Sequence, residues 1–376
     1  MLKVFISNSI LSDIIFQAED NSKTTHDAVY QLLKSHQTVI YVSDKYSDTL
    51  PLEVELFCQN YGNIPKENRC DYISGIQSNP SMVLKEPSSV FLLDIDPKEA
   101  KNIGEKYGVI CLSKDNAHKA GAMLIDDNKE YSPDAKKDFY DGWATVLSGI
   151  KSLPSNSLII NDRYLFSNKE HWKGDGLNNV CKILQLLLPA TFAERGTGLS
   201  YNVLIVFDPG ELCEGHTFRS IALELISKIT SMRKYTIKLE ILGISKGMRI
   251  DSIYFRLHNR RIVSNYYIIK AEQQIAAFHG TKGTCAQTIT PQRFFTTDSL
   301  VKDTNSSSPQ RSIQQLVEVL EDFDPNYVID SDGYKAYYYF SATGNDNIKE
   351  ECRNLANRLI RKKKTKTDKE LYLQYQ

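Results

Sequence analysis

The chain has 376 residues, and its 46 lysine and arginine residues balance its 46 aspartate and glutamate residues. With a net charge of zero, the chain has no overall positive field that would attract it to nucleic acid or to a membrane. Any such contact therefore needs a local patch of basic residues. Hydrophobic residues make up 41% and charged residues 24% of the chain, which is typical of a globular protein with room for two domains.

The first residues and the cysteines favour a cytoplasmic protein. The first apolar run is interrupted by Ser7, Asn8, Ser9 and Asp13, and no cleavage site of small residues follows it, so it does not have the layout of a signal peptide. A run of about 18 apolar residues is absent, and no transmembrane segment is expected. The seven cysteines are scattered without a CxxC pair, which argues against a disulfide framework or a structural zinc site.

Residues 1–130 are predicted to form one α/β domain. The helix over 97–108 has Pro97 at its start and Gly108 past its last turn, the usual asymmetry of helix ends. Strands that alternate with helices favour a parallel, three-layer arrangement. The expected strands are 3–11, 38–44, 88–95 and 109–113, and the other expected helix is 26–36.

A second α/β domain is expected over 155–300, after a linking helix within 131–154. A final region, 301–376, is predicted to be a linker followed by a helical basic tail that contains one aromatic strand, YKAYYYFS. The expected elements of the second domain are strands over 157–166, 201–208 and 235–245, helices over 177–189 and 217–233, and a strand pair within 255–269.

The segment FRLHNRRIVSNYYII, residues 255–269, places His258, Arg260 and Arg261 between two strand-like runs. Phospholipase-D-type enzymes use the pattern HxKxxxxD twice, with one histidine that attacks phosphorus and lysines that hold the phosphoryl oxygens. Here Arg260 stands in place of the lysine and Asn265 in place of the aspartate. Arginine can bind phosphate through two hydrogen bonds, but asparagine cannot stabilise a histidinium as a carboxylate does.

A second copy of this pattern would fall in HWKGDGLN, which offers His171, Lys173 and Asn178. A histidine two residues before a lysine or arginine is a weak signal by itself. Three interpretations of the first copy therefore stay open: a working hydrolase, a site that binds phosphate or nucleic acid, and a charged hairpin without a ligand.

The stretch that runs from SLIINDRYLF to IIKAEQQIAAFH resembles the phospholipase-D-like module at the C-terminus of MIT-domain proteins and its bacterial relatives. The Asp-x-Tyr of that pattern is matched by Asp162 and Tyr164, and its His-Asp-Arg by His258 and Arg260, with Asn259 in place of the aspartate. The glycine-rich stretch of the family is here KAEQQIAAF, without glycine. Over roughly 155–285 the resemblance implies a phospholipase-D fold that binds phosphate through His258, Arg260, Arg261, Asn265, Asp162 and Tyr164.

The segment DPKEAKNIGEKYGVICLSKD resembles the later half of PIN-type nucleases, because Asp96 opens a helix and Asp115 follows a strand. In that family, carboxylates at the strand ends hold Mg²⁺ or Mn²⁺, which activates water. Ser7 stands where the first aspartate is expected, and Asp13 could replace it only if the next helix begins early. The resemblance implies metal ligands at Asp96 and Asp115 and catalytic residues at Asp96, Asp115 and Asp13.

Simpler roles remain open for these acidic residues. Asp96 can be a helix cap and Asp115 a turn residue, and Asp94 or Asp44 are further candidates for a third metal ligand. In FDPGELCEGHTF, residues 207–218, Asp208 and His216 could face the cleft of His258, although the turn chemistry of this segment explains it without a function.

The sequence thus predicts two α/β domains: a PIN-like three-layer domain, followed by a phospholipase-D-like domain with a helical C-terminal tail. By fold-level analogy, the two resemblances imply a prokaryotic nucleic-acid-associated protein, a phosphate-binding component of a defence or conflict system with degenerate nuclease-type sites. One alternative is an active metal-dependent PIN-like nuclease, a phosphodiesterase with Mg or Mn as cofactor. The other is a protein or membrane adaptor without nucleic-acid binding, acting with a partner protein in a multi-subunit complex.

Overall fold

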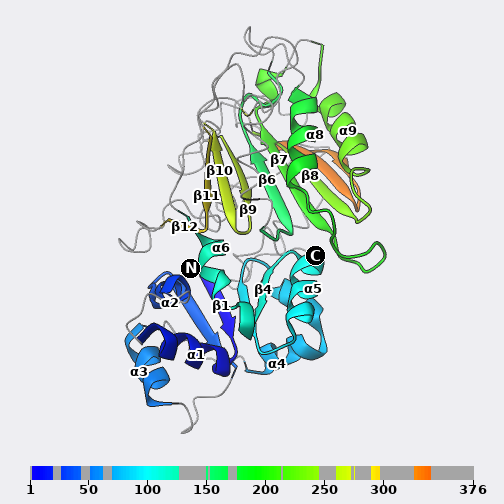
Figure 1. The fold of residues 1–376 in the computed structure, drawn as a ribbon. Coiled ribbons are helices and arrows are strands. Elements are labelled where there is room, and N and C mark those ends of the chain that lie inside the picture. The colour runs from blue at the N-terminus through cyan, green and yellow to red at the C-terminus, as the bar shows by residue number, and fades with distance from the viewer. Residues whose placement is uncertain are drawn as a thin grey trace.

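The computed structural model describes residues 2–19, 27–43, 51–61, 70–126, 150, 153–167, 176–212, 215–244, 260–271, 275, 289–296 and 326–339. These ranges form an α/β structure with a four-stranded parallel sheet and an eight-stranded mixed sheet. In Figure 1 the four-stranded sheet is in the lower half and the eight-stranded sheet in the upper half. None of the helices in these ranges combines the length and the apolar character needed to cross a bilayer.

The first sheet has the strand order β2-β1-β3-β4, and all of its strands are parallel. Helices cover both of its faces: Leu2, Val4 and Ile6 pack with α1, α2, α3 and α6, whereas Phe5 packs with α4 and α5. The elements are β1 (Leu2–Ile6), α1 (Asn8–Glu19), α2 (Asp27–Lys34), β2 (Thr38–Val42), α3 (Leu52–Tyr61), α4 (Cys70–Ser78), η1 (Pro80–Lys85), β3 (Val90–Leu93), α5 (Pro97–Tyr107), β4 (Ile110–Ser113), η2 (Lys114–Asn116), α6 (Lys119–Leu124) and β5 (Ile125–Asp126).

The second sheet has the strand order β11-β10-β9-β6-β7-β8-β14-β13. Its central strands β6, β7, β8 and β14 are parallel, and β9 runs antiparallel to β6. Helices α8 and α9 cover one face, as Figure 1 shows. The elements are β6 (Ser157–Asn161), α8 (Gly176–Leu187), β7 (Tyr201–Phe207), η3 (Pro209–Glu211), α9 (Phe218–Ile229), β8 (Ile237–Ile244), β9 (Arg261–Ser264), β10 (Tyr267–Ala271), β11 (Ile289–Arg293), β12 (Phe295–Thr296), β13 (Asn326–Asp330) and β14 (Tyr334–Tyr339).

Two expected strands are shorter than the sequence suggested. The strand expected over 3–11 ends at Ile6, and α1 begins at Asn8, because Ile10, Leu11, Ile14 and Ile15 recur at helical spacing and are buried. The strand expected over 157–166 ends at Asn161. A turn follows it, in which the Asp162 side chain accepts the backbone N–H of Tyr164.

The two sheets meet at a junction built from buried polar side chains. The side-chain amides of Asn156 and Asn265 both donate hydrogen bonds to the carbonyl oxygens of Pro87 and Gly108. The Tyr266 hydroxyl donates to the Ser89 carbonyl and accepts the Ile110 N–H. These contacts join the β9–β10 turn of the second sheet to β3, α5 and β4 of the first.

The predicted domain boundaries do not separate the two hydrophobic cores. Phe294 and Phe295, from the predicted second domain, are fully buried in the core of the first sheet, and β12 pairs with β5. The aromatic strand of the predicted tail is β14 and extends the second sheet. The linking helix expected within 131–154 lies outside the described residues except at positions 150, 153 and 154, and the structure describes only residues 326–339 of the predicted tail.

Candidate functional site

The carboxyl edge of the second sheet gathers charged side chains from strands that are distant in the sequence. Strands β6 and β7 are parallel, so both end at this edge, and the antiparallel β9 begins there. The residues that follow β6 and precede β9 therefore lie side by side. Ligands of α/β proteins bind at such edges, outside the carboxyl ends of the strands.

Asp162 and Arg260 meet at this edge, with 3.6 Å between Asp162 Oδ1 and Arg260 Nε. The Asp162 carboxyl is fully buried, and its oxygens accept the N–H groups of Tyr164 (3.0 Å) and Ile275 (2.6 Å). Burial raises the pKa of Asp162 to about 6, although both N–H groups and the charge of Arg260 act to lower it. Asp162 and Arg260 come from the two separate parts of the predicted phospholipase-D-like signature, and the structure places them next to each other.

Tyr164 completes this group. The guanidinium carbon of Arg163 lies 5.0 Å from the centre of the Tyr164 ring, and that of Arg260 lies 5.9 Å from it. Both distances are in the range of cation–π contacts. A buried carboxylate and an aromatic ring together orient Arg260, whose side chain keeps 19% of its surface exposed.

Arg163 and Glu211 are part of this edge, and sequence reasoning did not single them out. Arg163 Nη2 lies 2.6 Å from Glu211 Oε1, and its Nε lies 3.4 Å from Asp208 Oδ2. The other Asp208 oxygen accepts the Gly210 N–H, as expected for a turn residue. An arginine two residues after the end of a buried strand, in NDRYLF, is the sequence feature that points to Arg163. His216, the predicted companion of Asp208, is exposed.

Arg261 lies on the other face of the sheet from Arg260, because successive side chains of a strand alternate. It pairs in register with Asn161 on β6 and with Lys270 on β10. Burial lowers the pKa of both Arg261 and Lys270, and the charge of Arg261 lowers that of Lys270 further. The predicted phosphate ligands Arg260 and Arg261 are therefore divided between two faces.

The structure does not place Asn265 with the other predicted phosphate ligands. It lies at the opposite end of β9 from Arg260, where its amide donates to Pro87 and Gly108 of the first sheet. Its oxygen accepts the Ser264 hydroxyl and the Asn156 N–H. The four-residue strand separates it from the charged edge. His258, like His171 and Lys173, lies outside the described residues.

The strand order of the first sheet reverses direction between β1 and β3, and ligands of α/β proteins bind outside the carboxyl ends of the strands at such a point. The Ser7 hydroxyl accepts the Asp94 N–H, and the Asp94 carboxylate accepts the Ser9 hydroxyl. Lys114 Nζ lies 2.9 Å from Asp13 Oδ2. Its hydrogen bond and charge interaction with Asp13 raise the pKa of Lys114, with smaller contributions from Asp94 and Asp115. Helix α1 begins early enough to bring Asp13 to this end of the sheet, which was the condition for Asp13 to act as a metal ligand. Its carboxylate, however, pairs with the Lys114 ammonium.

Asp96 is the N-cap of α5 and accepts the Lys98 N–H at 2.8 Å, and Asp115 is an exposed residue of η2. In the part of the chain that the structure describes, no three Asp, Glu, His or Cys side chains are arranged as metal ligands. Asp44 lies outside that part. As they stand, Asp13, Asp96 and Asp115 do not fit a Mg²⁺ or Mn²⁺ site, because Lys114 pairs with the first and α5 holds the second.

The chain matches no protein-family model, no curated protein sequence and no solved structure.

Proposed function

We propose that this protein binds phosphate groups of nucleic acid through the charged edge of a phospholipase-D-like second half, and that this site binds rather than cleaves. The observation that carries the proposal is the meeting of Asp162, Tyr164 and Arg260 from distant segments. An arginine has five N–H donors in a planar fork, so it can contact a carboxylate and a phosphate at the same time. We include His258 in the proposed site because it is two residues before Arg260 in the sequence.

Two features favour binding over cleavage. The position of the catalytic aspartate is held by Asn265, which lies at the far end of β9 and contacts the first sheet. The buried carboxylate of the site itself, Asp162, pairs with Arg260. The further step to a prokaryotic defence or conflict system in the cytoplasm rests on the family resemblance alone.

For the first half we propose a PIN-like domain that has lost its nuclease site. The parallel sheet with a reversal between β1 and β3 supports this fold, and Ser7 and Lys114 support the loss of activity. The Lys114 ammonium supplies, next to Asp13, the positive charge that a metal ion would supply in an active enzyme. The rival proposal of an active nuclease has no such supporting contact among the described residues.

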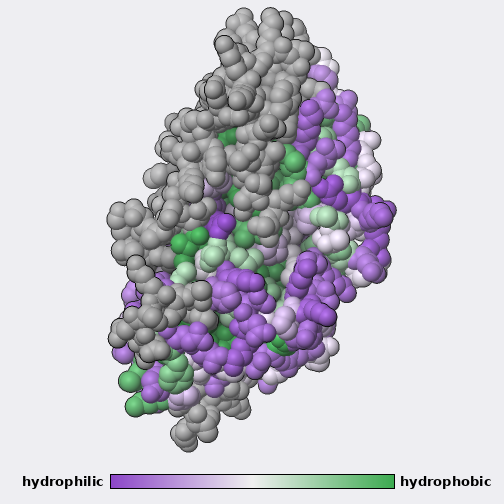
Figure 2. All heavy atoms as spheres, in the orientation of Figure 1, coloured by the Kyte–Doolittle hydropathy of each residue, from purple (hydrophilic) through white to green (hydrophobic). Residues whose placement is uncertain are grey.

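A specific observation also favours a second candidate, a protein adaptor. Helices α1 and α3 contact each other and expose the apolar side chains of Phe16, Leu52, Leu56 and Tyr61. Figure 2 shows hydrophobic residues at the lower left, over the position of α3 in Figure 1. Exposed apolar clusters mark interaction sites when they are contiguous.

The test is fluorescence anisotropy with labelled single-stranded RNA and DNA, in EDTA and in Mn²⁺. Arg260→Gln and His258→Ala should each weaken binding about tenfold, because charge-assisted contacts to phosphate are lost. Arg260→Lys should recover only part of the affinity, since lysine lacks the planar fork. Lys228→Gln, which changes net charge equally in the last turn of α9, is the control and should have no effect.

Other outcomes would decide for the rivals. Cleavage in Mn²⁺ that Asp96→Ala abolishes would establish the nuclease. Tight binding that neither Arg260→Gln nor His258→Ala changes would place the nucleic-acid site elsewhere. If no labelled RNA or DNA binds, the proposal of a protein adaptor is favoured.

A further inference from the structure

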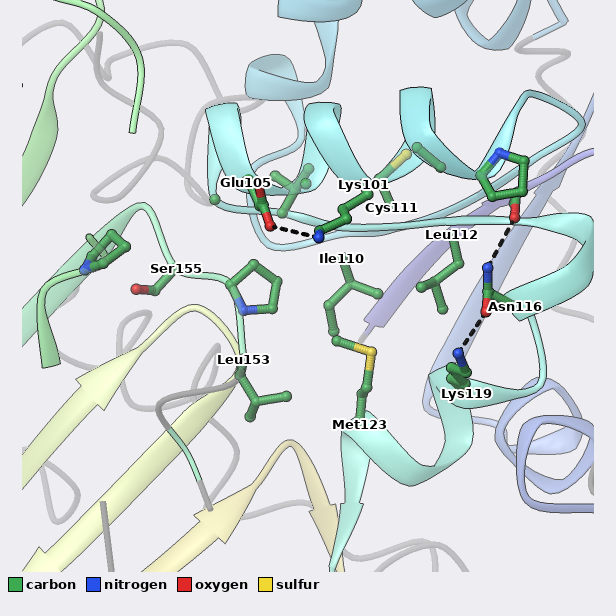
Figure 3. A pocket seen from close by; sticks show the side chains of 18 of the residues that line it. Lys101, Glu105, Ile110, Cys111, Leu112, Asn116, Lys119, Met123, Leu153 and Ser155 are labelled. Carbon is green, nitrogen blue, oxygen red and sulfur yellow. Dashed lines mark hydrogen bonds and ion pairs between the residues drawn. The ribbon is translucent and has the colours of Figure 1, made fainter. Parts of the chain in front are cut away.

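A cavity of about 680 Å³ lies at the junction of the two sheets (Figure 3). The first sheet contributes walls from α5, the edge strand β4 and α6. Residues 153–155, just before β6, and 189–191, just after α8, form the other side. Binding sites for small molecules occur preferentially at such places between domains, in cavities of this size.

The middle of the cavity is apolar. Figure 3 shows the side chains of Ile110, Leu112 and Met123 gathered on one side, with Leu153 nearby. Cys111 also lines the cavity, and burial raises the pKa of its thiol to about 12, with a smaller contribution from Glu99. The thiol therefore stays protonated, so the cavity presents apolar surface and no thiolate nucleophile.

The charges that line the cavity are unequal, with three lysines and one glutamate. Lys101 pairs with Glu105 at 3.7 Å, as Figure 3 shows. Lys119 donates to the neutral Asn116 side chain, and in the described ranges neither Lys98 nor Lys119 forms an ion pair. Both lie at the carboxyl end of the first sheet, since Lys98 is in the first turn of α5, after β3, and Lys119 follows β4.

The cavity walls are held in place by the junction. Gly108, which lines the cavity, has a φ of +63°, and a Cβ at this position would lie 2.1 Å from the Ser155 carbonyl oxygen. The hydrogen bonds of Asn156 and Asn265 to Gly108 fix the same contact. A ligand would therefore enter a preformed cavity and would not have to order its walls, which favours affinity.

We propose that this junction cavity binds a small organic anion, with an apolar ring or chain against Ile110, Leu112 and Met123 and a carboxylate or phosphate held by Lys98 and Lys119. An apolar body fits the apolar middle of the cavity, and an anionic group complements the positive charge of the two lysines that line it. This site is separate from the charged edge of the second sheet, and it shares no residue with the proposed nucleic-acid site.

Three probes with one aromatic body test the proposal: naphthoate, naphthyl phosphate and naphthol. Calorimetric titration at low salt should show that at least one anion binds about tenfold more tightly than neutral naphthol. The tighter of the two anions identifies the head group. Lys98→Gln and Lys119→Gln should each weaken anion binding severalfold without changing naphthol binding. Lys106→Gln, on the same helix but outside the cavity, is the matched control.

Steric filling gives an independent readout. Leu112→Trp should abolish binding of all three probes, because the larger side chain fills the cavity. If Leu112→Trp does not fold, the lysine variants still test the proposal, provided that their thermal transitions match that of wild type. Equal affinity for naphthol and the anions, or no binding of any probe, would overturn the proposal, as would equal losses with Lys106→Gln and Lys119→Gln. Because Arg260→Gln should leave probe binding intact, failure of the nucleic-acid proposal is distinguishable from failure of this one.

Discussion

At the residue scale, Asp162 couples the charged edge to pH. Its pKa of about 6 in the folded protein lies above the ordinary value of 3.8, with burial as the main cause. Between these two values the folded protein holds a proton that the unfolded chain has released. The raised pKa therefore favours the folded state below the ordinary value, and this contribution is lost as the pH rises through the folded value.

Asp162→Asn should remove this pH dependence, because the amide does not titrate. From about pH 4 to about pH 7, wild type should lose up to about 3 kcal/mol of unfolding free energy relative to the variant. Urea unfolding of both proteins at the two pH values measures the difference. If the two proteins change in parallel with pH, the buried carboxyl is not the titrating group.

At the element scale, the hairpin of β9 and β10 has two roles at its two ends. Arg260 and Arg261 lie at the charged edge, and Asn265 and Tyr266 form the turn that contacts the first sheet. Burial raises the pKa of the Tyr266 hydroxyl, so it stays protonated and can donate to Ser89 while it accepts from Ile110. One short element therefore joins the candidate site to the junction.

Tyr266→Phe should lower the free energy of unfolding by about 1–3 kcal/mol, because it leaves a buried carbonyl and a buried N–H without their partner. Chemical denaturation measures the loss. Tyr334→Phe, at an exposed position of β14, is the matched control and should change stability little. Equal effects of the two substitutions would show that the hydroxyl of Tyr266 is not a stabilising bridge.

At the scale of the whole molecule, the two sheets pack so closely that one position at their contact has no room for a side chain. Gly108 ends α5 in the left-handed conformation, and its φ of +63° favours glycine. The Ser155 carbonyl occupies the space that a Cβ would need. The glycine thus serves both the end of a helix and the contact between the sheets.

Gly108→Ala should cost more than about 3 kcal/mol, because backbone strain of about 1–2 kcal/mol adds to a clash between backbone groups. Gly198→Ala is a matched control: its φ is +77°, but no atom lies within 4 Å of the added Cβ. That variant should show only the strain. Differential scanning calorimetry of both variants measures the loss of stability. Similar losses for the two variants would show that the contact between Gly108 and Ser155 can widen without a cost in free energy.

Much of the secondary structure was readable from local pattern. Helix α5 begins and ends where Pro97 and Gly108 predicted, because caps depend on neighbouring residues alone. The alternation of strands and helices predicted an α/β fold, which the structure confirms. The boundary between β1 and α1 was missed, because a short apolar run does not distinguish a strand from the buried face of a helix.

The composition of the sites depended on tertiary contacts that no local pattern contains. The sequence pointed to Asp162 in NDRYLF and to Arg260 in HNRR. Only the pairing of β6 with β9 shows that these two residues are neighbours and that Asn265 lies at the opposite end of β9. Lys114 beside Asp13 and the cavity between α5 and residues 153–155 join segments that are distant in the sequence. Local propensity acts over a few residues, whereas strand register and packing between sheets decide which distant side chains become neighbours.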